Sequence, residues 1–393
     1  MANNTPKVPQ IRFKGFTDAW VKRKLGECVL IQRGASPRPI EKYITSQANG
    51  INWIKIGDVS PNSRYITSTK EKIVPEGIQY SRKVFAGDLI LSNSMSFGRP
   101  YILAIDGCIH DGWLLIRDEN NYFDLEYLLQ VLSSDEMLNQ YHALASGGVV
   151  NNLNSALVQS TTIEIPKNKF EQSKIGTFFK HLDELIALYK QKHEKLQNVK
   201  KALLEKMFPK NGDTKPQIRF KGFTDAWERR KLGELCEITT GKLDANAMDK
   251  DGIYDFYTSG IQKYKINHYA FEGPAITIAG NGATVGYMHY ADGRFNAYQR
   301  TYVLSSFCAK RKFLFQEISI KLPQKIAQEA RSGNIPYIVL EMLTDLKVNI
   351  PTNKEQEKIG AFFKHLDKLI ALHQCKYEKL QNVKKSLLKK MFV

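Results

Sequence analysis

This chain of 393 residues has little cysteine and no long apolar run. Its five cysteines include no Cys-x-x-Cys pair, which argues against a zinc site or a disulfide framework and favours a reduced compartment. No stretch approaches the roughly 20 apolar residues of a membrane span, and the first ten residues lack the apolar core of a secretory signal. The sequence therefore predicts a cytoplasmic protein with no metal site and no membrane contact.

Familiar catalytic motifs are missing too. There is no Pro-Pro dipeptide, hence no Asp/Asn-Pro-Pro-aromatic element of an amino-methyltransferase, and no Walker lysine loop. His181 and His365 stand two residues before Asp183 and Asp367, but helix positions two apart point about 200° away from each other. Helix packing or solvent exposure explains these histidines better than acid–base chemistry, so we expect no catalytic residue.

One glycine-rich segment, residues 280–286 (GNGATVG), invites comparison with a phosphate-binding loop. A predicted strand follows it instead of a helix, and the Lys-Ser/Thr ending is absent. We interpret it as a hairpin between predicted strands Ala275–Ala279 and Tyr287–Tyr290. Residues 92–99 (SNSMSFGR) are expected to take the same place in the first half of the chain.

The sequence does contain a short and a long repeat, each present twice, and we call these repeats the frame. Pro9–Trp20 and Pro216–Trp227 both read PQIRFKGFTDAW. Glu171–Phe208 returns 184 positions later as Glu355–Phe392, with only 9 of 38 positions changed. The segments between these repeats, which we call the inserts, have almost no sequence in common. They are predicted to be mixed α/β with short strands. Two similar frames with two different inserts indicate a protein that reads two different targets with one geometry.

The net charge of +17 favours a polyanionic partner. Residues 28–163 carry a net charge of −2 and residues 235–348 a net charge of +2, so the excess lies in the repeated frame. Nucleic acid is the best candidate, because such a field attracts phosphates without regard to sequence. The alternative is that the lysines form a solvated helix face.

The long repeats have a heptad pattern and are predicted to be helices of about 50 Å. Lysines interrupt the pattern at Lys192, Lys206, Lys376 and Lys390. Each apolar stripe needs a partner, and the nearest is the other copy in an antiparallel pair; a parallel pair or another protein are the competing arrangements. The predicted pairing residues are Ile175, Phe178, Leu182, Leu185, Leu196, Val199, Leu203, Ile359, Phe362, Leu366, Leu369, Leu380, Val383 and Leu387.

The order of insert, helix, insert and helix closely resembles the specificity subunit of type I restriction–modification enzymes. The resemblance covers essentially the whole chain, and its most specific part is the pair of EQ-x-KIG-x-FFKHLD helices. Supporting motifs are Ile165-Pro166, Ile350-Pro351, Lys24–Glu27, Lys231–Glu234, Gly286 and Tyr254–Tyr257.

The resemblance implies an α/β (α+β) fold with an internal pseudo-twofold repeat. It implies target recognition domains at 1–168 and 210–353, and two long antiparallel coiled-coil helices at 169–209 and 354–393. Each domain would read half of an asymmetric, bipartite double-stranded DNA site, while the helices set the spacer and dock two modification subunits. Restriction subunits complete the complex. This chain would need no cofactor, because its partners bring S-adenosylmethionine, ATP and magnesium.

Candidate DNA-binding residues are polar side chains near glycine turns, together with lysine doublets repeated on both helices. They are equally ordinary as loop and surface residues. The candidates are Arg33, Ser36, Arg38, Ser92, Ser94, Arg99, Lys242, Asn281, Thr284, Asn296 and Arg300, with Lys200, Lys201, Lys384 and Lys385 on the helices. Two other function classes remain open at this point: a coiled-coil scaffold that never meets DNA, and an autonomous DNA-modifying enzyme.

Overall fold

The computed structural model describes residues 8–59, 63–93, 97–145, 152–210, 212–329 and 336–392. The chain forms two compact units: Met1–Lys190 with Cys375–Val393, and Gln191–Gln374. We call them the first and second unit. Helices α4 (Lys169–Met207) and α7 (Asn353–Met391) each contribute one half to either unit. Among the described residues, no helix has both the length and the apolar character needed to cross a membrane.

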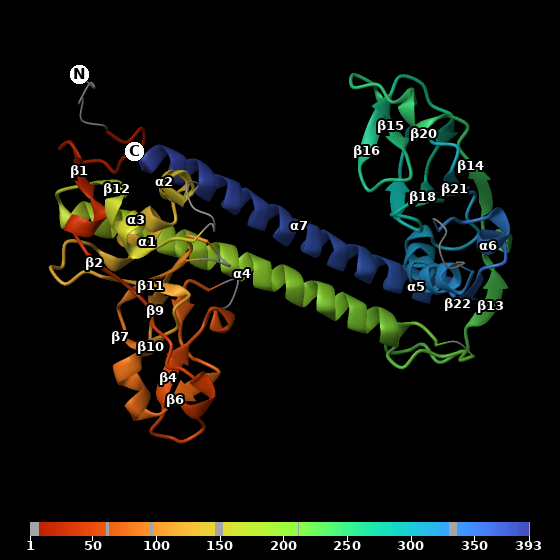
Figure 1. Ribbon diagram of the computed structural model, residues 1–393. Helices are drawn as coiled ribbons and strands as arrows, with labels where there is room; N and C mark the ends of the chain where they lie inside the picture. The colour runs from red at the N-terminus through yellow and green to blue at the C-terminus, as the bar shows by residue number, and fades with distance from the viewer. Residues whose placement is uncertain are drawn as a thin grey trace. The chain divides into compact units, whose positions relative to one another are not determined.

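The first unit is built on two five-stranded sheets. A separate antiparallel pair, β1 with β12, precedes helix α4 (Figure 1). The first sheet has the order β2 (Leu30–Arg33), β11 (Trp113–Arg117), β8 (Leu89–Ser92), β9 (Pro100–Leu103) and β5 (Tyr65–Ile66). The second has the order β3 (Ile44–Thr45), β6 (Glu71–Ile73), β4 (Ile51–Ile54), β10 (Gly107–Ile109) and β7 (Arg82–Val84). The remaining elements are β1 (Val21–Lys24), β12 (Thr162–Ile165), α1 (Leu125–Leu132), α2 (Asp135–Ala145) and α3 (Ser155–Ser160).

Both faces of the first sheet are buried. Leu89 and Leu91 of β8 join the large core that includes side chains of α1 and α4. Ile90, between them, joins the core shared with the second sheet. This alternation follows from the period of two along a strand. It explains why β8 is buried along its whole length, as expected for a strand covered on both faces.

The second unit repeats this plan with smaller sheets. One sheet has the order β14 (Glu237–Thr240), β21 (Thr301–Ser305), β18 (Ala275–Ala279) and β19 (Met288–Ala291). The other has the order β16 (Lys263–Ile266), β15 (Tyr254–Tyr257), β20 (Arg294–Ala297) and β17 (Phe271–Glu272). The pair β13 (Glu228–Lys231) and β22 (Lys347–Ile350), with helices α5 (Arg311–Glu329) and α6 (Leu340–Thr344), completes the unit. The predicted glycine-rich hairpin is confirmed, since β18 and β19 pair antiparallel on either side of it.

Within each unit the two long helices run antiparallel. In the first unit Phe179 of α4 lies beside Phe392, with ring centroids 6.0 Å apart, and Lys376 lies over the ring of Tyr189. In the second unit Phe208 lies 5.9 Å from Phe363 by ring centroids. Farther toward the N-terminus of α4, His193 Nδ1 is 3.2 Å from Ile370 O. In both units the numbers fall along one helix as they rise along the other, which confirms the antiparallel prediction.

The predicted pairing residues divide into two groups. Those in or against the cores are Ile175, Leu182, Leu380 and Leu387 in the first unit and Leu196, Leu203, Ile359 and Leu366 in the second. Leu369 is half-buried. The prediction is wrong for Phe178, Leu185, Val199, Phe362 and Val383, which are all at least 36% exposed.

Phe179 and Ile186 in the first unit, and Phe363 and Ile370 in the second, occupy the places predicted for their neighbours. The helix face that meets the cores steps by four and three residues from Ile175, whereas the predicted heptad stepped by three and four. The helix turns every 3.6 residues, and here it packs on a globular core as well as on one partner helix.

Candidate functional site

Several loops of the first unit meet at one end of the sheet that contains β2, β8 and β11. Gly34 N donates to Trp113 O at 2.8 Å, and Asn93 N donates to Gly112 O at 3.1 Å. Leu153 N donates to Asn93 O at 3.1 Å, which brings in the segment before α3. We call residues 33–38, 93, 97–99 and 110–112 the first loop cluster.

Three predicted DNA-binding residues converge on Asp111 in this cluster. Ser36 Oγ donates to Asp111 Oδ1 at 3.1 Å, and the Arg38 guanidinium lies 3.6 Å from Oδ2 while 82% exposed. Arg33 Nε donates to the Asp111 main-chain oxygen at 3.2 Å. His110 Nε2 lies 2.9 Å from Oδ1. Asp111 was missed from sequence; its place in a turn just before a buried strand was the available signal.

The other first-insert candidates are placed differently. Ser92 is fully buried, and its hydroxyl has no hydrogen-bond partner among the described residues. Its prediction as a base-reading residue is therefore wrong, because the side chain faces the core between the sheets. Arg99 is exposed, with its guanidinium 5.3 Å from the centroid of the Tyr101 ring. Ser94 lies outside the described residues.

The second unit holds an equivalent second loop cluster, residues 240–243, 280–286 and 298–300. Gly280 N donates to Arg300 O at 2.8 Å, Gly241 N to Thr301 O at 3.1 Å, and Ile338 N to Gly280 O at 2.7 Å. These three bonds match the three that build the first loop cluster. The hairpins also agree, because Gly98 N donates to Ser92 O and Gly286 N to Ala279 O. The expectation that residues 92–99 take the place of the glycine-rich hairpin is confirmed.

One glycine in each cluster permits a close backbone approach. A Cβ on Gly34 would lie 2.1 Å from His110 O, and one on Gly241 would lie 2.0 Å from Ala297 O. Both distances are far too short for any other residue. Glycine therefore lets the first strand of each sheet end directly against the neighbouring loop, and it fixes the position of the side chains that follow.

Four of the five second-insert candidates lie in the second loop cluster. Lys242 and Arg300 are exposed. Asn281 Oδ1 accepts a hydrogen bond from Ser259 Oγ at 2.7 Å, and Thr284 Oγ1 donates to Ser259 O.

Asn296 is different. It is 2% exposed, its Nδ2 donates to His268 O at 3.3 Å, and its Oδ1 accepts from Ala297 N at 2.9 Å. The prediction of base contact is therefore wrong for Asn296, whose amide is used to hold neighbouring backbone.

The repeated sequence motifs attach each insert to its helix. Arg12 Nε and Nη2 donate to the two carboxylate oxygens of Glu171 at 2.6 and 2.8 Å. Arg219 and Glu355 repeat this bidentate pair at 2.7 and 2.8 Å. The glutamines that follow the two glutamates donate to Pro166 O and Pro351 O, at 3.2 and 2.8 Å. The Ile-Pro and Glu-Gln motifs thus form one clasp, present in both units.

Lysines from the repeated doublets pair with an aspartate of the opposite helix. Lys384 Nζ donates to Asp183 Oδ1, and Lys200 Nζ lies 2.6 Å from Asp367 Oδ1. Lys384 is 7% exposed, and burial lowers its pKa to about 8. The ammonium groups of Lys200 and Lys384 are thus engaged between helices, and phosphate binding by these two lysines stays a prediction. Their neighbours Lys201 and Lys385 are exposed.

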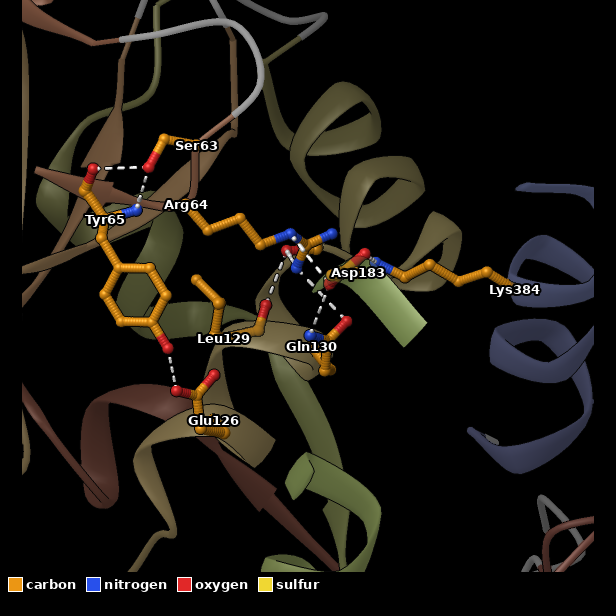
Figure 2. A network of polar contacts seen from close by, with 9 residues as sticks. Ser63, Arg64, Tyr65, Glu126, Leu129, Gln130, Asp183 and Lys384 are labelled. Atoms are coloured by element: carbon orange, nitrogen blue, oxygen red, sulfur yellow. Dashed lines mark hydrogen bonds and ion pairs between the residues drawn. The ribbon is translucent and has the colours of Figure 1, made fainter. Parts of the chain in front are cut away.

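Asp183 collects partners from three parts of the first unit (Figure 2). Besides Lys384, it contacts Arg64 Nε at 3.2 Å and accepts from Gln130 Nε2 at 3.3 Å. In the second unit Asp367 likewise accepts from Gln316 Nε2, at 3.4 Å. Burial lowers the pKa of Arg64, and Asp183 opposes that shift.

The two histidines considered above for acid–base chemistry belong to neither loop cluster. His181 and His365 are exposed on the helices. Within the described ranges, no three or more histidine, cysteine, aspartate or glutamate side chains gather where they could hold a metal ion. Exposed arginine and lysine side chains, with half-buried asparagine and hydroxyl groups beside them on a fixed loop scaffold, are instead suited to hydrogen bonding with a polar partner.

The family of type I restriction modification DNA specificity domains matches residues 17–198 and 224–382. The chain belongs to that family. Both loop clusters lie inside the matched ranges of the specificity-domain family, one in each.

Individual specificity subunits are similar to the chain over different lengths. A segment of 157 residues is 39% identical to the EcoDI specificity subunit of Escherichia coli, covering 40% of this chain and 34% of that protein. The match thus spans about a third of the Escherichia coli protein. A putative type I specificity subunit of Mycoplasma genitalium is 21% identical over 88% of this chain and 94% of its own length.

Two solved structures have a similar fold. The crystal structure of a type I restriction–modification S subunit from Mycoplasma genitalium has a TM-score of 0.72 at 16% identity, covering 98% of this chain and 99% of that one. A chain from a study of complex assembly and conformational transition in the type I system has a TM-score of 0.51 at 17% identity, covering 95% and 97%. Both likenesses show a shared fold over nearly the whole chain.

Proposed function

We propose that this chain is the DNA sequence-recognition subunit of a type I restriction–modification complex. Each insert reads one half of an asymmetric, bipartite double-stranded site, and the long helices set the spacer between the halves. The observation that carries the proposal is the pair of loop clusters: the same three backbone hydrogen bonds present different side chains in each unit. Such an arrangement supports one geometry of approach to DNA with two different sequence preferences.

The first loop cluster is suited to direct readout of bases. Arg38 is exposed yet restrained by Asp111, so its guanidinium is partly oriented before DNA arrives. An arginine can donate two hydrogen bonds to guanine, and such a contact contributes about 1–3 kcal/mol of discrimination. In the second cluster, Asn281 and Arg300 offer an amide and a guanidinium on the same scaffold.

The long helices carry apolar side chains that are left partly exposed. Phe178 and Phe362, Leu188 and Leu372, and Val199 and Val383 are matched pairs in the two repeats, each at least 36% exposed. An apolar surface that is present on both helices can bind two copies of the same partner in equivalent ways. This supports docking of two modification subunits on the helices, with restriction subunits joining the assembled complex.

The chain acts in this proposal without an active site of its own. S-adenosylmethionine enters with the modification subunits, and ATP and magnesium enter with the restriction subunits. What the specificity subunit supplies is position: its loops select the duplex, and its helices hold the catalytic partners beside it. Incubation of the isolated chain with DNA and all three cofactors is expected to give neither methylation nor cleavage.

Sequencing of methylated adenines tests the proposal in a host that carries this chain with its partner subunits. Arg38→Ala is expected to relax one base of the first half-site, while Asn281→Ala changes only the second. Arg23→Ala, an exposed arginine outside the loop cluster, is the matched control and is expected to leave the methylated sequence unchanged. If wild-type chain and partners methylate no bipartite site, the proposed function fails. If they do but both variants behave as wild type, only the residue assignments fail.

A further inference from the structure

The first unit contains a cavity of about 790 Å³ beside the pairing of α4 with the C-terminal half of α7. The start of α2 forms another wall, and Figure 1 shows the end of α7 beside that helix. The lining is rich in basic side chains, with three carboxylates among them. The basic residues are Arg64, Arg99, Lys190, Lys384, Lys385 and Lys389. The carboxylates are Asp135, Glu136 and Asp183.

At one edge of the cavity, two positively charged side chains share a single carboxylate, which leaves an excess of positive charge. Arg64 and Lys384 approach the same Asp183 from opposite sides (Figure 2). Their side chains are only 26% and 9% exposed, so water screens them poorly. Burial lowers the pKa of Lys384 to about 8, as expected where two cations share one anion. An anion bound next to this pair would relieve that excess.

Three of the nine differences between the two helical repeats lie in the lining of this cavity. Lys190, Tyr377 and Lys389 all line it, and all three are among the nine changed positions. Their copies in the other repeat are Gln374, His193 and Glu205. Each change makes the cavity more basic or more aromatic than the equivalent positions of the other repeat. Most of the remaining repeat-derived lining is the same in both copies.

Apolar and aromatic groups complete the lining. Ile186, Leu388, Tyr377 and Phe392 contribute to the same cavity as the cations. A binding site with several cations next to an aromatic surface can accept both the phosphate and the ring of a nucleotide. A volume of several hundred cubic ångströms is typical of small-molecule sites.

We infer that this cavity is a phosphate-binding site, in which Arg64, Lys190, Lys385 and Lys389 hold a phosphate group and Tyr377 packs against an attached ring. The same chemistry is offered by a free nucleotide and by the backbone of a DNA duplex. In the duplex case the inference rests on the proposed function; in the nucleotide case it is independent of it. The second unit lacks the lysines that Lys190 and Lys389 provide, so the site belongs to the first unit.

The test uses the full chain and a double variant, Lys190→Gln with Lys389→Glu. Both substitutions place the residue found at the equivalent position of the other repeat, so the helix tolerates them. The control is Lys379→Glu, an exposed residue of α7 outside the cavity lining. Thermal unfolding is followed during titration with pyrophosphate and with ATP, at constant ionic strength set with sodium chloride. Circular dichroism checks that the variants are folded.

We expect pyrophosphate and ATP to raise the midpoint of unfolding of the wild type and of the control. The double variant should bind pyrophosphate and ATP at least roughly tenfold more weakly than the wild type, because charge-assisted hydrogen bonds to phosphate are strong. A midpoint shift for ATP that exceeds the shift for pyrophosphate, and is reduced by Tyr377→Ala, would indicate contact with the ring.

A second arm measures binding to a non-specific duplex over a range of salt concentrations. If free phosphates do nothing but the double variant lowers the salt slope relative to Lys379→Glu, the phosphate belongs to a DNA backbone. If neither free phosphates nor the duplex distinguish the double variant from the control, the inference is overturned. The sequence of methylated sites is read separately, so a failure of the proposed function does not decide this result.

Discussion

At the scale of single residues, the short repeat and the Glu-Gln motif both occur twice because each unit contains the same buried arginine–glutamate ion pair. Glu171 and Glu355 are 1% and 0% exposed, and each accepts hydrogen bonds from Nε and Nη2 of an arginine in the short repeat. A carboxylate this deep is costly unless it is paired and hydrogen-bonded. The sequence revealed both halves of the clasp as repeats, but the partners lie 159 and 136 positions apart, and no local pattern joins them.

Replacing only the arginine of one clasp should therefore lower the free energy of unfolding more than replacing both the arginine and the glutamate. Arg12→Met leaves Glu171 buried without its partner, and we expect the free energy of unfolding of the first unit to fall by about 3–5 kcal/mol. Adding Glu171→Leu removes the stranded charge and should recover a large part of that loss. Urea denaturation of the wild type, the single and the double variant measures both steps. A double variant no more stable than Arg12→Met would contradict the argument.

A second buried carboxylate predicts a dependence of stability on pH. Glu317 of α5 is fully buried, and its Oε1 accepts a hydrogen bond from Asn349 N at 2.8 Å. Burial raises its pKa to about 7. Between about pH 4.5 and 7 the folded chain therefore keeps a proton that the unfolded chain has lost. The contribution of this group to stability falls as pH rises through that window and is constant above it.

Glu317→Gln keeps an acceptor for Asn349 and carries no charge at any pH. We expect the variant to gain on the wild type as pH rises from 5 to 8, by up to roughly 3 kcal/mol for a shift of this size. Denaturation of both proteins at each pH gives the difference. A difference that does not change with pH would show that Glu317 has an ordinary pKa.

The candidate site shows how far residue-level prediction reaches. Polar side chains next to glycine turns did collect into two clusters, because such turns bring strand ends together. Ser92 and Asn296 were assigned wrongly, since both end or lie in strands and face inward. The period of two could have revealed the first case: Ser92 shares the face of Ile90, which belongs to the inner core. Asp111 was missed because an acidic residue is an unexpected centre for a DNA-binding loop.

At the scale of elements, the long helices were predicted well in extent and less well in phase. Two adjacent phenylalanines occur in each repeat, so the apolar pattern alone fits either phase. Phe179 is buried with Trp20 and Phe392, whereas Phe178 is 36% exposed and packs edge-on against Phe13 at 5.8 Å. The choice depends on the globular core that the helix also covers, and a helix sequence contains no record of that core.

This pair of neighbours gives a matched comparison. Phe179→Ala should lower the free energy of unfolding by about 3–5 kcal/mol, as expected for a large cavity in a closed core. Phe178→Ala removes the same atoms from a partly exposed position and should cost clearly less. Thermal or chemical denaturation ranks the two. Equal losses would mean that the burial of the two side chains is not as the structure has it.

If modification subunits dock on the exposed side chains of the helices, Phe178 has a second role. Phe178→Ala should then weaken binding of purified modification subunit while leaving the fold nearly intact. Phe179→Ala would weaken binding only to the extent that it unfolds the first unit. Co-purification and isothermal titration with the modification subunit separate the two effects. No loss of binding by Phe178→Ala, or by Leu188→Ala about three turns farther along α4, would place the docking surface elsewhere.

At the scale of the whole molecule, the first compact unit is completed by a segment that is remote in sequence. The core of the first unit includes Met391 and packs against Leu380, Leu387 and Phe392 from the far end of the chain. The second unit is one continuous stretch, and its core includes Met207 and Phe208 at the end of α4. The sequence predicted only that the two helices pair antiparallel, and the structure shows that these helix ends also enter the cores.

Removal of residues 375–393 should therefore unfold one unit and spare the other. The first unit loses Met391 and Phe392 from its core, together with the partner of Asp183, whereas residues 191–374 remain whole. Calorimetry should show the transition of the second unit preserved and that of the first unit lost or shifted far down, with proteolysis confined to the first unit. Deletion of Val393 alone is the control. Adding a peptide of residues 375–393 should restore protection in the first unit, because the deleted helix packs through side-chain contacts and not through the chain connection. If the truncated chain keeps both transitions, the C-terminal half of α7 contributes nothing essential to the first core.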